Sequence, residues 1–462
     1  MKTSTVNENL TAMAFVLAAA LLTGCGPKSA TPTNSMAAKS IPPASAAWPD
    51  PLVLVLVPQV GDMKTDVEIR KFQDQVRQGS NRDLALEQLG WLFVAKARES
   101  FDAGYYKLAE QCALAMEQND PQSNAALLLR GHVLDSLHRF HEAEILARQL
   151  VERRGEGFDY GLLGDALMEQ GRLNEAVAAY QRMMNLRPDL HAYARAAHVR
   201  WLTGDLDGAI EAMSLAVSAA TPHDPESTAW VSTRLANYEF QAGRPDRASR
   251  LCRAALSFQT NYPPALLLRG KMLLADGKPA EAVKSLRAAA QFNPLPEYEW
   301  VLADALRAAG CESESATVEA QLRRGGAASD PRTLALFLAT RRQSPELALR
   351  LAREELASRG DVFTHDALAW ALWADAQDAA AQAEMQLALA AGTQDARLFF
   401  HAAVIASQSG RAIDALNWTK KSEAVAQMLL PSERKELQEL SSRLALPGTA
   451  AARRPETQIS AF

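Results

Sequence analysis

The chain has 462 residues, with 54 acidic and 49 basic side chains and a formal net charge of −5. A mildly acidic sequence without a stripe of basic residues argues against nucleic acid as a partner. Cys25 aside, three widely spaced cysteines remain (Cys112, Cys252 and Cys311), and this odd number does not suggest a disulfide framework.

The N-terminus carries an apolar run, Leu10 to Leu22, that is too short to span a bilayer as a permanent helix. It ends in Leu22-Thr23-Gly24-Cys25, which resembles the lipobox of bacterial lipoproteins. The resemblance implies that residues 1–24 are a signal peptide and that Cys25 carries the lipid. An ordinary secretory signal with a chance cysteine is the alternative. Gly26 stands where many such lipoproteins have an inner-membrane retention signal, so we expect an outer-membrane lipoprotein facing the periplasm, touching the membrane through its lipid only.

Residues 25–62 are expected to form a flexible tether, because residues 26–50 are rich in Ala, Pro, Ser and Thr and cannot bury enough apolar surface to fold. A short apolar, β-prone run interrupts the tether at residues 51–60 (PLVLVLVPQV). We favour a strand or extended segment packed on the first helices. A strand offered to the sheet edge of a partner is the alternative.

Residues 63–77 and the residues from Asp83 onward read as helices, and beyond them the sequence repeats. Small residues recur at steps of mostly 33 or 34 residues: Ala97, Gly131, Gly164, Ala197, Ala236, Gly270, Ala303, Ala339, Ala369 and Ala403. A second small residue follows most of them twelve positions later, as at Ala109, Ala143, Ala176, Ala209, Ala248, Ala282, Ser315, Ala381 and Ala415. Two antiparallel helices approach closely only where the side chains at their crossing are small. A glycine between them ends the first helix in the left-handed conformation.

The third unit shows the whole pattern: Tyr160-Gly161-Leu162-Leu163-Gly164, then Gly171, Ala176, Tyr180 and Pro188. Spacing and residue types resemble the tetratricopeptide repeat (TPR) family, over about residues 90–425 as ten units. The resemblance implies an all-α fold, a right-handed superhelical solenoid of about ten TPR-like helix pairs over residues 63–445. An N-terminal half-repeat would precede the pairs and a capping helix from about 430 to 444 would follow them. Ser315 and the short eighth unit predict a bend or altered stacking there, and residues 446–462 are expected to be a disordered tail.

No pattern for catalysis or cofactor binding is present. The sequence lacks a phosphate-binding glycine loop, a nucleophile elbow and a paired-histidine zinc motif, and His141-Glu142 has no second histidine. We therefore predict no enzyme activity, no cofactor and no metal site. His365-Asp366 and His401 lie on neighbouring units, where they are expected to meet as packed or groove-lining residues.

In TPR solenoids, positions two, five, nine and twelve of each unit line the concave surface. Those positions hold most of the tryptophans of this chain. The predicted ligand groove comprises Trp91, Arg98, Trp201, Trp230, Asn237, Lys271, Trp300, Asp304, Trp370 and Trp373. Tryptophan is enriched at binding hot spots, but aromatic rings also pack in cores. We expect Trp201 and Trp373 to pack, and Trp230, Trp300 and Trp370 to contact a ligand.

Two functions compete. The first is a non-enzymatic scaffold that holds a protein or peptide partner in the aromatic-lined groove, which is the commoner use of such surfaces. The alternative is a module that binds envelope polysaccharide, or an accessory subunit of an export system, because flat aromatic faces along a groove suit sugar rings.

Overall fold

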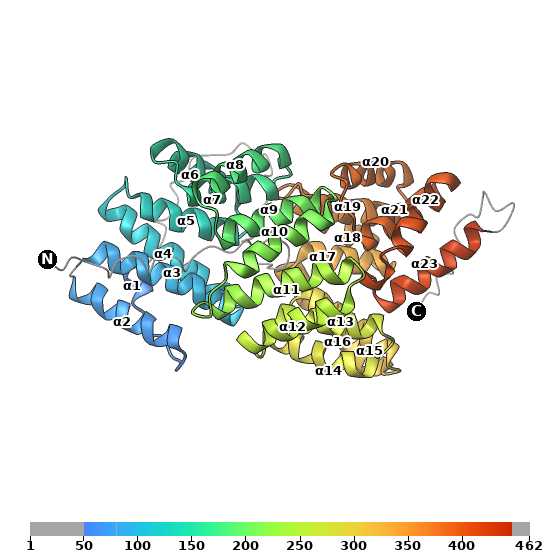
Figure 1. The fold of residues 1–462 in the computed structure, drawn as a ribbon, viewed down its shortest axis with the longest axis horizontal. Coiled ribbons are helices and arrows are strands. Elements are labelled where there is room, and N and C mark those ends of the chain that lie inside the picture. Colours follow the sequence, from blue (N-terminus) through green and yellow to red (C-terminus); the bar gives the residue numbers. More distant parts are fainter. Residues whose placement is uncertain (1–49, 80, 446–462) are drawn as a thin grey trace, which may run out of the picture. The chain divides into compact units, whose positions relative to one another are not determined.

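The computed structural model describes residues 50–79 and 81–445, and every regular element within them is a helix (Figure 1). The predicted all-α fold of paired helices is therefore confirmed. The chain divides into two compact units, with the boundary after Ala166 within α7 (Gly157–Glu169). The predicted signal peptide (residues 1–24), Cys25, the tether as far as residue 49 and the tail (residues 446–462) lie outside the described residues. No helix among the described residues is long and apolar enough to cross a membrane.

The first unit begins earlier than predicted. Its helices are α1 (Pro51–Val55), α2 (Lys64–Gln78), α3 (Arg82–Ser100), α4 (Gly104–Asn119), α5 (Asn124–Ser136), α6 (Phe140–Arg153) and the start of α7. The prediction of a strand at residues 51–60 is wrong, because the first half of this run is the short helix α1. Asp50 caps α1 by accepting a hydrogen bond from the backbone N–H of Leu52, and Pro51 occupies the first helical position. The expected packing on the first helices is nevertheless found, since α1 contacts α4 and Val55 is fully buried.

The second unit continues the helix pairs to the end of the described chain. Its helices after α7 are α8 (Leu173–Leu186), α9 (Leu190–Leu202), α10 (Leu206–Ser218), α11 (Pro225–Gln241), α12 (Pro245–Phe258), α13 (Pro263–Ala275), α14 (Pro279–Phe292), α15 (Pro296–Ala308), α16 (Glu312–Ser329), α17 (Pro331–Thr340), α18 (Pro345–Leu356), α19 (Val362–Ala374), α20 (Asp378–Leu389), α21 (Ala396–Gln408), α22 (Ala412–Glu423) and α23 (Pro431–Leu444). A short 3₁₀ turn, η2 (Ala426–Met428), connects α22 to α23. The predicted capping helix is confirmed at α23.

Local sequence signals set the starts of these helices. Asp189, Asp224 and Asp361 each stand at an N-cap and accept hydrogen bonds from backbone N–H groups of the first turn. Proline opens several others, including α13 and α15, where its missing N–H costs no hydrogen bond. The helices from α8 to α22 are 10 to 18 residues long. Capping aspartates and prolines such as these mark where many of them begin.

Small residues at the crossings let the helices of a pair touch. Ala176, Ala209 and Ala282 are fully buried at the predicted positions. A side chain at Gly270 would collide with Leu286 of the paired helix α14. Ser315 fits the same role because its hydroxyl is buried and donates a hydrogen bond to the carbonyl oxygen of Ala303, 2.7 Å away. The serine therefore satisfies its own polar group without widening the crossing.

The first helix of each pair is buried on more sides than the second. In α13, the buried residues are Pro263, Ala265, Leu266, Leu267, Leu268, Gly270 and Leu274, which cover the whole circumference. In α14 they form one stripe, Ala282, Ser285, Leu286 and Ala289. A stripe indicates one covered face, and burial all round indicates neighbours on every side. The first helices are therefore the inner layer of the second unit.

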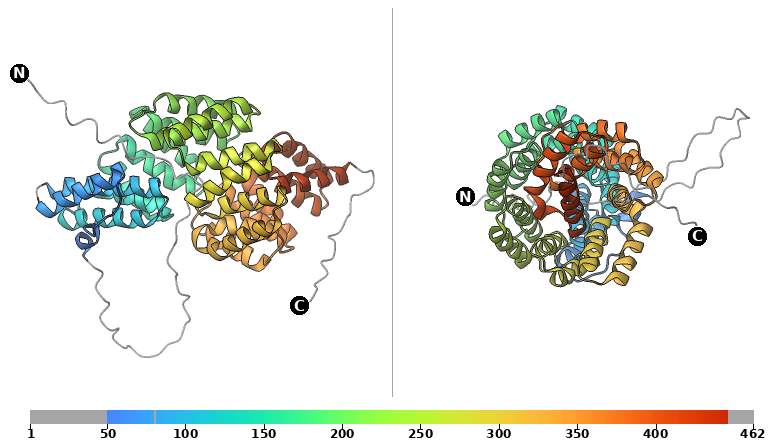
Figure 2. Two further views of the ribbon diagram at one scale, coloured as in Figure 1. Left: turned by 90° about the horizontal axis from the view of Figure 1, so that it is seen from below. Right: turned by 90° about the vertical axis from the view of Figure 1, so that its right-hand side faces the viewer.

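Within the second unit, segments about 190 residues apart lie against each other. The backbone N–H of Gly360 donates to the carbonyl oxygen of Glu169 at 3.0 Å, and Arg359 forms an ion pair with the Glu169 carboxylate at 2.7 Å. Further along, the Thr393 hydroxyl donates to the carbonyl oxygen of Leu202 at 2.6 Å. The helices of this unit, drawn from green to orange, close into a ring in the end-on view (Figure 2), with red C-terminal helices inside its outline. The superhelix thus completes a turn, and the next turn packs on the first.

We expect Gly171→Ala to destabilise the second unit by roughly 3 kcal/mol or more, since alanine is strained in the left-handed region and its methyl would overlap another backbone. Gly171 has φ +76°, and a Cβ there would collide with the carbonyl oxygen of Gly360. Gly243 is the matched control, with φ +71° and open space around it, so Gly243→Ala should cost only about 1–2 kcal/mol. Urea denaturation followed by circular dichroism measures both. Equal losses for the two variants would contradict the packing of turn on turn.

Candidate functional site

The inner helices carry the predicted groove residues, but most of the tryptophan rings are covered. Trp300 and Trp370 are each 1% exposed, and Trp201 and Trp373 are also buried. Only Trp230 in the second unit and Trp91 in the first are part-exposed among the six. A ring that is 1% exposed presents no face to a ligand. The expectation that Trp300 and Trp370 contact a ligand therefore does not fit this structure, in which both rings are packed.

Trp370 lies at the centre of a stack of rings. Its ring centroid is 4.0 Å from that of Trp373 and 3.9 Å from that of His401, nearly parallel to both. Its indole N–H donates to the Thr340 hydroxyl at 2.9 Å, and His401 Nδ1 lies 2.8 Å from an oxygen of Asp366. The expected meeting of Asp366 and His401 is thus found. The ring stack and its hydrogen bond to Thr340 connect α17, α19 and α21, so Trp370 is part of the hydrophobic core.

Trp201 is a second packed ring, at the contact between superhelical turns. Its centroid is 5.7 Å from that of Phe363, which follows it by 162 positions, and the rings are nearly parallel. Its indole N–H donates to the Gln241 side chain at 2.8 Å, and the Gln241 amide in turn donates to the carbonyl oxygen of Gln394. The prediction that Trp201 and Trp373 pack is in agreement with their burial.

The charged groove residues of α15 form a buried network. Asp304 is 2% exposed and lies 3.7 Å from Arg341 and 3.9 Å from Arg307. Both arginines reach Glu319 of α16 at 2.8 Å. Burial raises the pKa of Asp304, and the backbone N–H of Ser432, which donates to it at 3.2 Å, opposes that rise. The predicted groove residue Asp304 is therefore engaged by the C-terminal helix of its own chain.

The start of α23 occupies the inner surface formed by α13, α15 and α21. Arg397 of α21 donates to the Glu433 carboxylate at 2.7 Å, while its guanidinium lies 4.6 Å from the ring centroid of Trp300. Arg434 donates to the carbonyl oxygen of Leu274, at the end of α13, at 2.7 Å. Burial would raise the pKa of Glu433, but Arg397 and the backbone N–H of Leu430 hold it below its usual value. The sequence predicts a solubilising cap here but not these contacts between α23 and the inner helices.

The sequence nevertheless contains a signal that one face of α23 is buried against the chain. Leu430, Glu433, Leu437 and Leu440 follow one another at steps of three, four and three, which places them on one face of a helix. All four are buried. A carboxylate in an otherwise apolar stripe indicates that the facing surface supplies a cation, which is Arg397 here.

One accessible part of the inner surface lies on α11 and α13, two neighbouring inner helices. Trp230 and Asn237 of α11 and Lys271 of α13 are all part-exposed. Lys271 pairs with Glu297 of α15 at 2.7 Å, so both signs of charge stand beside the tryptophan-bearing helix. We call Trp230, Asn237, Lys271 and Glu297 the open face. It offers an indole, an amide and an ion pair to a ligand.

The first unit carries two predicted groove residues. Trp91 is part-exposed on α3, and its ring centroid lies 5.4 Å from that of His132 on α5. Arg98, two turns further along α3, is buried. In the first unit, too, one predicted groove residue is a part-exposed aromatic ring and the other is a buried charged side chain.

A separate cleft of about 490 Å³ lies between the turns of the second unit, where α8 faces α19 and α20. Its lining includes Arg172, Asp361, His365 and the half-exposed Leu387. His365 Nδ1 lies 2.8 Å from the carboxylate of Glu384. Among the described residues there is no group of three or more His, Cys, Asp or Glu side chains that could hold a metal ion.

Residues 160–190 match the family model described as tetratricopeptide repeat. They are the unit whose sequence shows the whole repeat pattern. None of the curated proteins matches the chain in sequence.

Solved structures with similar folds include a complex described as the APC/C hetero-tetramer Cut9–Hcn1, at 14% identity and TM-score 0.42, covering 83% of this chain and 64% of that chain. This chain therefore spans less than two thirds of the length of that match. Another is the human IFIT1 dimer with PPP-AAAA, at 10% identity and TM-score 0.44, covering 82% and 94%. A third is described as a thermophilic TPR protein in Thermus thermophilus, at 21% identity and TM-score 0.34, covering 40% and 99%.

We expect Trp370→Ala to destabilise the second unit by about 3–5 kcal/mol, because a fully buried ring is lost from a stack and leaves a cavity. Trp230→Ala should cost less than about 2 kcal/mol, since that ring is part-exposed and loses less buried area. Thermal unfolding monitored by circular dichroism separates the two. A Trp370→Ala protein as stable as the wild type would restore the role of this residue as a ligand contact.

Proposed function

We propose that the protein is a non-enzymatic interaction scaffold that holds a protein or peptide partner on its inner surface and is anchored to the bacterial cell envelope by a lipid on Cys25. The observation that carries the proposal is the open face, where Trp230, Asn237 and Lys271 stay part-exposed on adjacent helices. An indole on one helix and a paired cation and anion on the neighbouring helices suit a peptide, which offers apolar side chains together with backbone and side-chain polar groups.

The glycan alternative has less support from this geometry. It depends on several flat ring faces spaced along one groove, and four of the six predicted rings are buried. Trp91 and Trp230, the part-exposed pair, belong to different units. A polysaccharide therefore becomes an outcome of the test below.

We expect Trp230→Ala with Asn237→Ala to reduce partner capture at least about tenfold, because a central indole commonly supplies more than about 1.4 kcal/mol of binding free energy. The bait is the full chain in a bacterial host, crosslinked mildly and recovered from solubilised membranes, with captured proteins quantified by mass spectrometry. Trp418→Ala is the control, because Trp418 is also part-exposed but lies on the outer helix α22.

Loss of the same proteins in the double variant but not in the control supports the open face as the site. Equal capture by all three forms would place the partner elsewhere. Capture of no protein, together with quenching of wild-type tryptophan emission by envelope polysaccharide, would favour the glycan module.

Lipidation is tested separately. In cells grown with an alkyne-labelled fatty acid, we expect the wild type to take up the label and fractionate with the outer membrane, and Cys25→Ala to lose both properties. The physical reason is that stable anchoring needs several acyl chains, which a lipidated N-terminal cysteine supplies. Cys311→Ala is the control, a half-buried cysteine far along the chain. Unchanged fractionation of Cys25→Ala would remove the lipid anchor from the proposal.

A further inference from the structure

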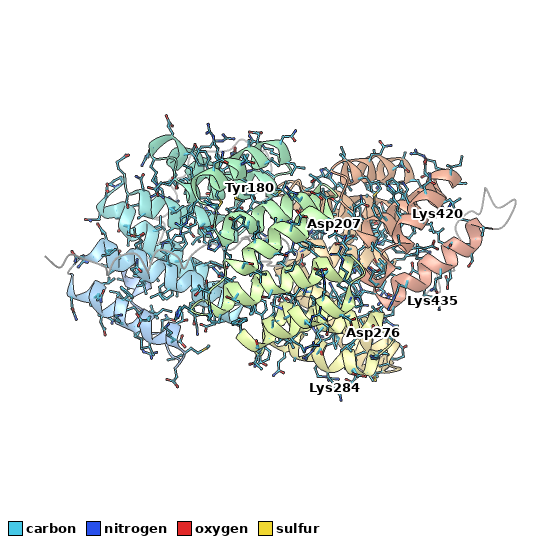
Figure 3. All side chains as sticks on the ribbon, viewed as in Figure 1. Tyr180, Asp207, Asp276, Lys284, Lys420 and Lys435 are labelled. Atoms are coloured by element: carbon cyan, nitrogen blue, oxygen red, sulfur yellow. The ribbon has the colours of Figure 1, made fainter. Side chains whose placement is uncertain are left out.

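Helix α23 packs on the inner helices of the second unit in the way that an amphipathic ligand helix packs in a groove. One face buries Leu430, Glu433, Leu437 and Leu440, each at most 2% exposed. Their spacing of three, four and three residues is that of the anchor positions in helix-in-groove recognition. The opposite face is exposed at Lys435, Gln438 and Glu439, and Figure 3 labels Lys435 on this helix.

Polar groups fix the direction and register of α23. Glu433 accepts a hydrogen bond from Arg397 at 2.7 Å, and the backbone N–H of Ser432 donates to Asp304 at 3.2 Å. Arg434 donates to the carbonyl oxygen of Leu274 at 2.7 Å. These partners come from α21, α15 and α13, three inner helices, so the surface is built by several repeats and recognises one helix end.

The closed arrangement leaves polar groups of this surface poorly satisfied. Trp300 Nε1 is buried and forms no hydrogen bond within the described residues, and Asp304 Oδ1 has only the longer ion pairs with Arg341 at 3.7 Å and Arg307 at 3.9 Å. Burial also raises the pKa of Glu436 and lowers that of Arg434, both on α23. A buried polar group without a partner opposes the state that buries it. The surface formed by α13, α15 and α21 therefore binds α23 less tightly than the apolar stripe of α23 alone would allow.

We propose that the surface beneath α23 is a helix-binding site, and that a protein partner enters it by displacing α23 with an amphipathic helix of the same pattern. The partner helix carries a carboxylate where Glu433 stands and apolar side chains three residues before it and four and seven residues after it. Arg397 and Asp304 read its first turn. The proposal rests on the proposed function, since it assumes a protein partner. It adds that the chain keeps part of its own inner surface closed, next to the open face on α11 and α13.

Hydrogen exchange of the wild-type full chain tests whether α23 opens by itself. We expect the amides of residues 434–444 to exchange at least about 100-fold faster than those of α21, because local opening needs less free energy than unfolding of the unit. Exchange of α23 as slow as that of α21 would overturn the proposal and make α23 a permanent cap.

Binding of a synthetic peptide with the sequence of residues 429–445 tests the vacated site. The full chain with Leu437→Asp and Leu440→Asp should bind this fluorescent peptide at least about tenfold more tightly than the wild type, because its own helix no longer competes. The peptide with Glu433→Gln should bind at least about tenfold more weakly than the native peptide, since it loses the charged hydrogen bond to Arg397. Lys435→Asp is the control, an exposed change on α23 that should leave the site closed.

Equal peptide binding by the double variant and the wild type would overturn the proposal. So would a wild-type dimer in which α23 is exchanged between two copies, because the occupant would then be the same chain. Should the double variant not fold, the exchange measurement on the wild type still decides. The two proposals fail separately. Loss of capture with Trp230→Ala beside a slowly exchanging α23 supports only the open face, and the reverse pattern supports only the site beneath α23.

Discussion

The close crossing of paired helices at small side chains is the constraint on which the rest of the structure depends. Ala176, Ala209 and Ala282 leave no space at the crossing, and Ser315 meets the same demand by bonding its hydroxyl to the facing carbonyl. Where the axes approach so closely, each pair presents one stripe to its neighbour and the next pair must stack in register. The inner and outer layers of the second unit follow from this stacking, because only the inner helices have neighbours on every side.

Closure of the superhelical turn is the second constraint on the structure. It buries residues of the inner surface that would otherwise be accessible to a ligand. Ends of the inner helices commonly leave carbonyl groups without partners. In the second unit, the carbonyl oxygens of Glu169 and Leu202 are bonded by Gly360 and Thr393 of the following turn. Trp201 packs on Phe363 across the same contact. Positions that would line an open groove in a shorter or wider solenoid have thus become a core between turns.

The inner surface of the second unit is therefore divided into two parts with different properties. The open face on α11 and α13 keeps Trp230 and Asn237 part-exposed. The surface on α15 and α21 is covered by α23, whose Glu433 pairs with Arg397 over the ring of Trp300. A scaffold built in this way has one contact surface available at once and another that depends on the position of a single terminal helix.

The sequence by itself determined the repeat, the helix pairs, the glycine and proline boundaries and the extent of α23, because these depend on local spacing and capping. It also indicated that Asp366 and His401 would meet, since they stand on adjacent repeats. It did not identify the short helix α1, because a short apolar run has no periodicity that separates strand from helix. Nor could it tell which tryptophans stay accessible. Trp230 and Trp300 both stand at predicted groove positions of their repeats, and only the tertiary structure packs Trp300 against Arg397 and Phe337 while leaving Trp230 part-exposed. Exposure on the inner surface depends on residues distant in the sequence, such as Arg397, which stands 97 positions after Trp300, and their approach is set by the summed rotation of all the repeats between them.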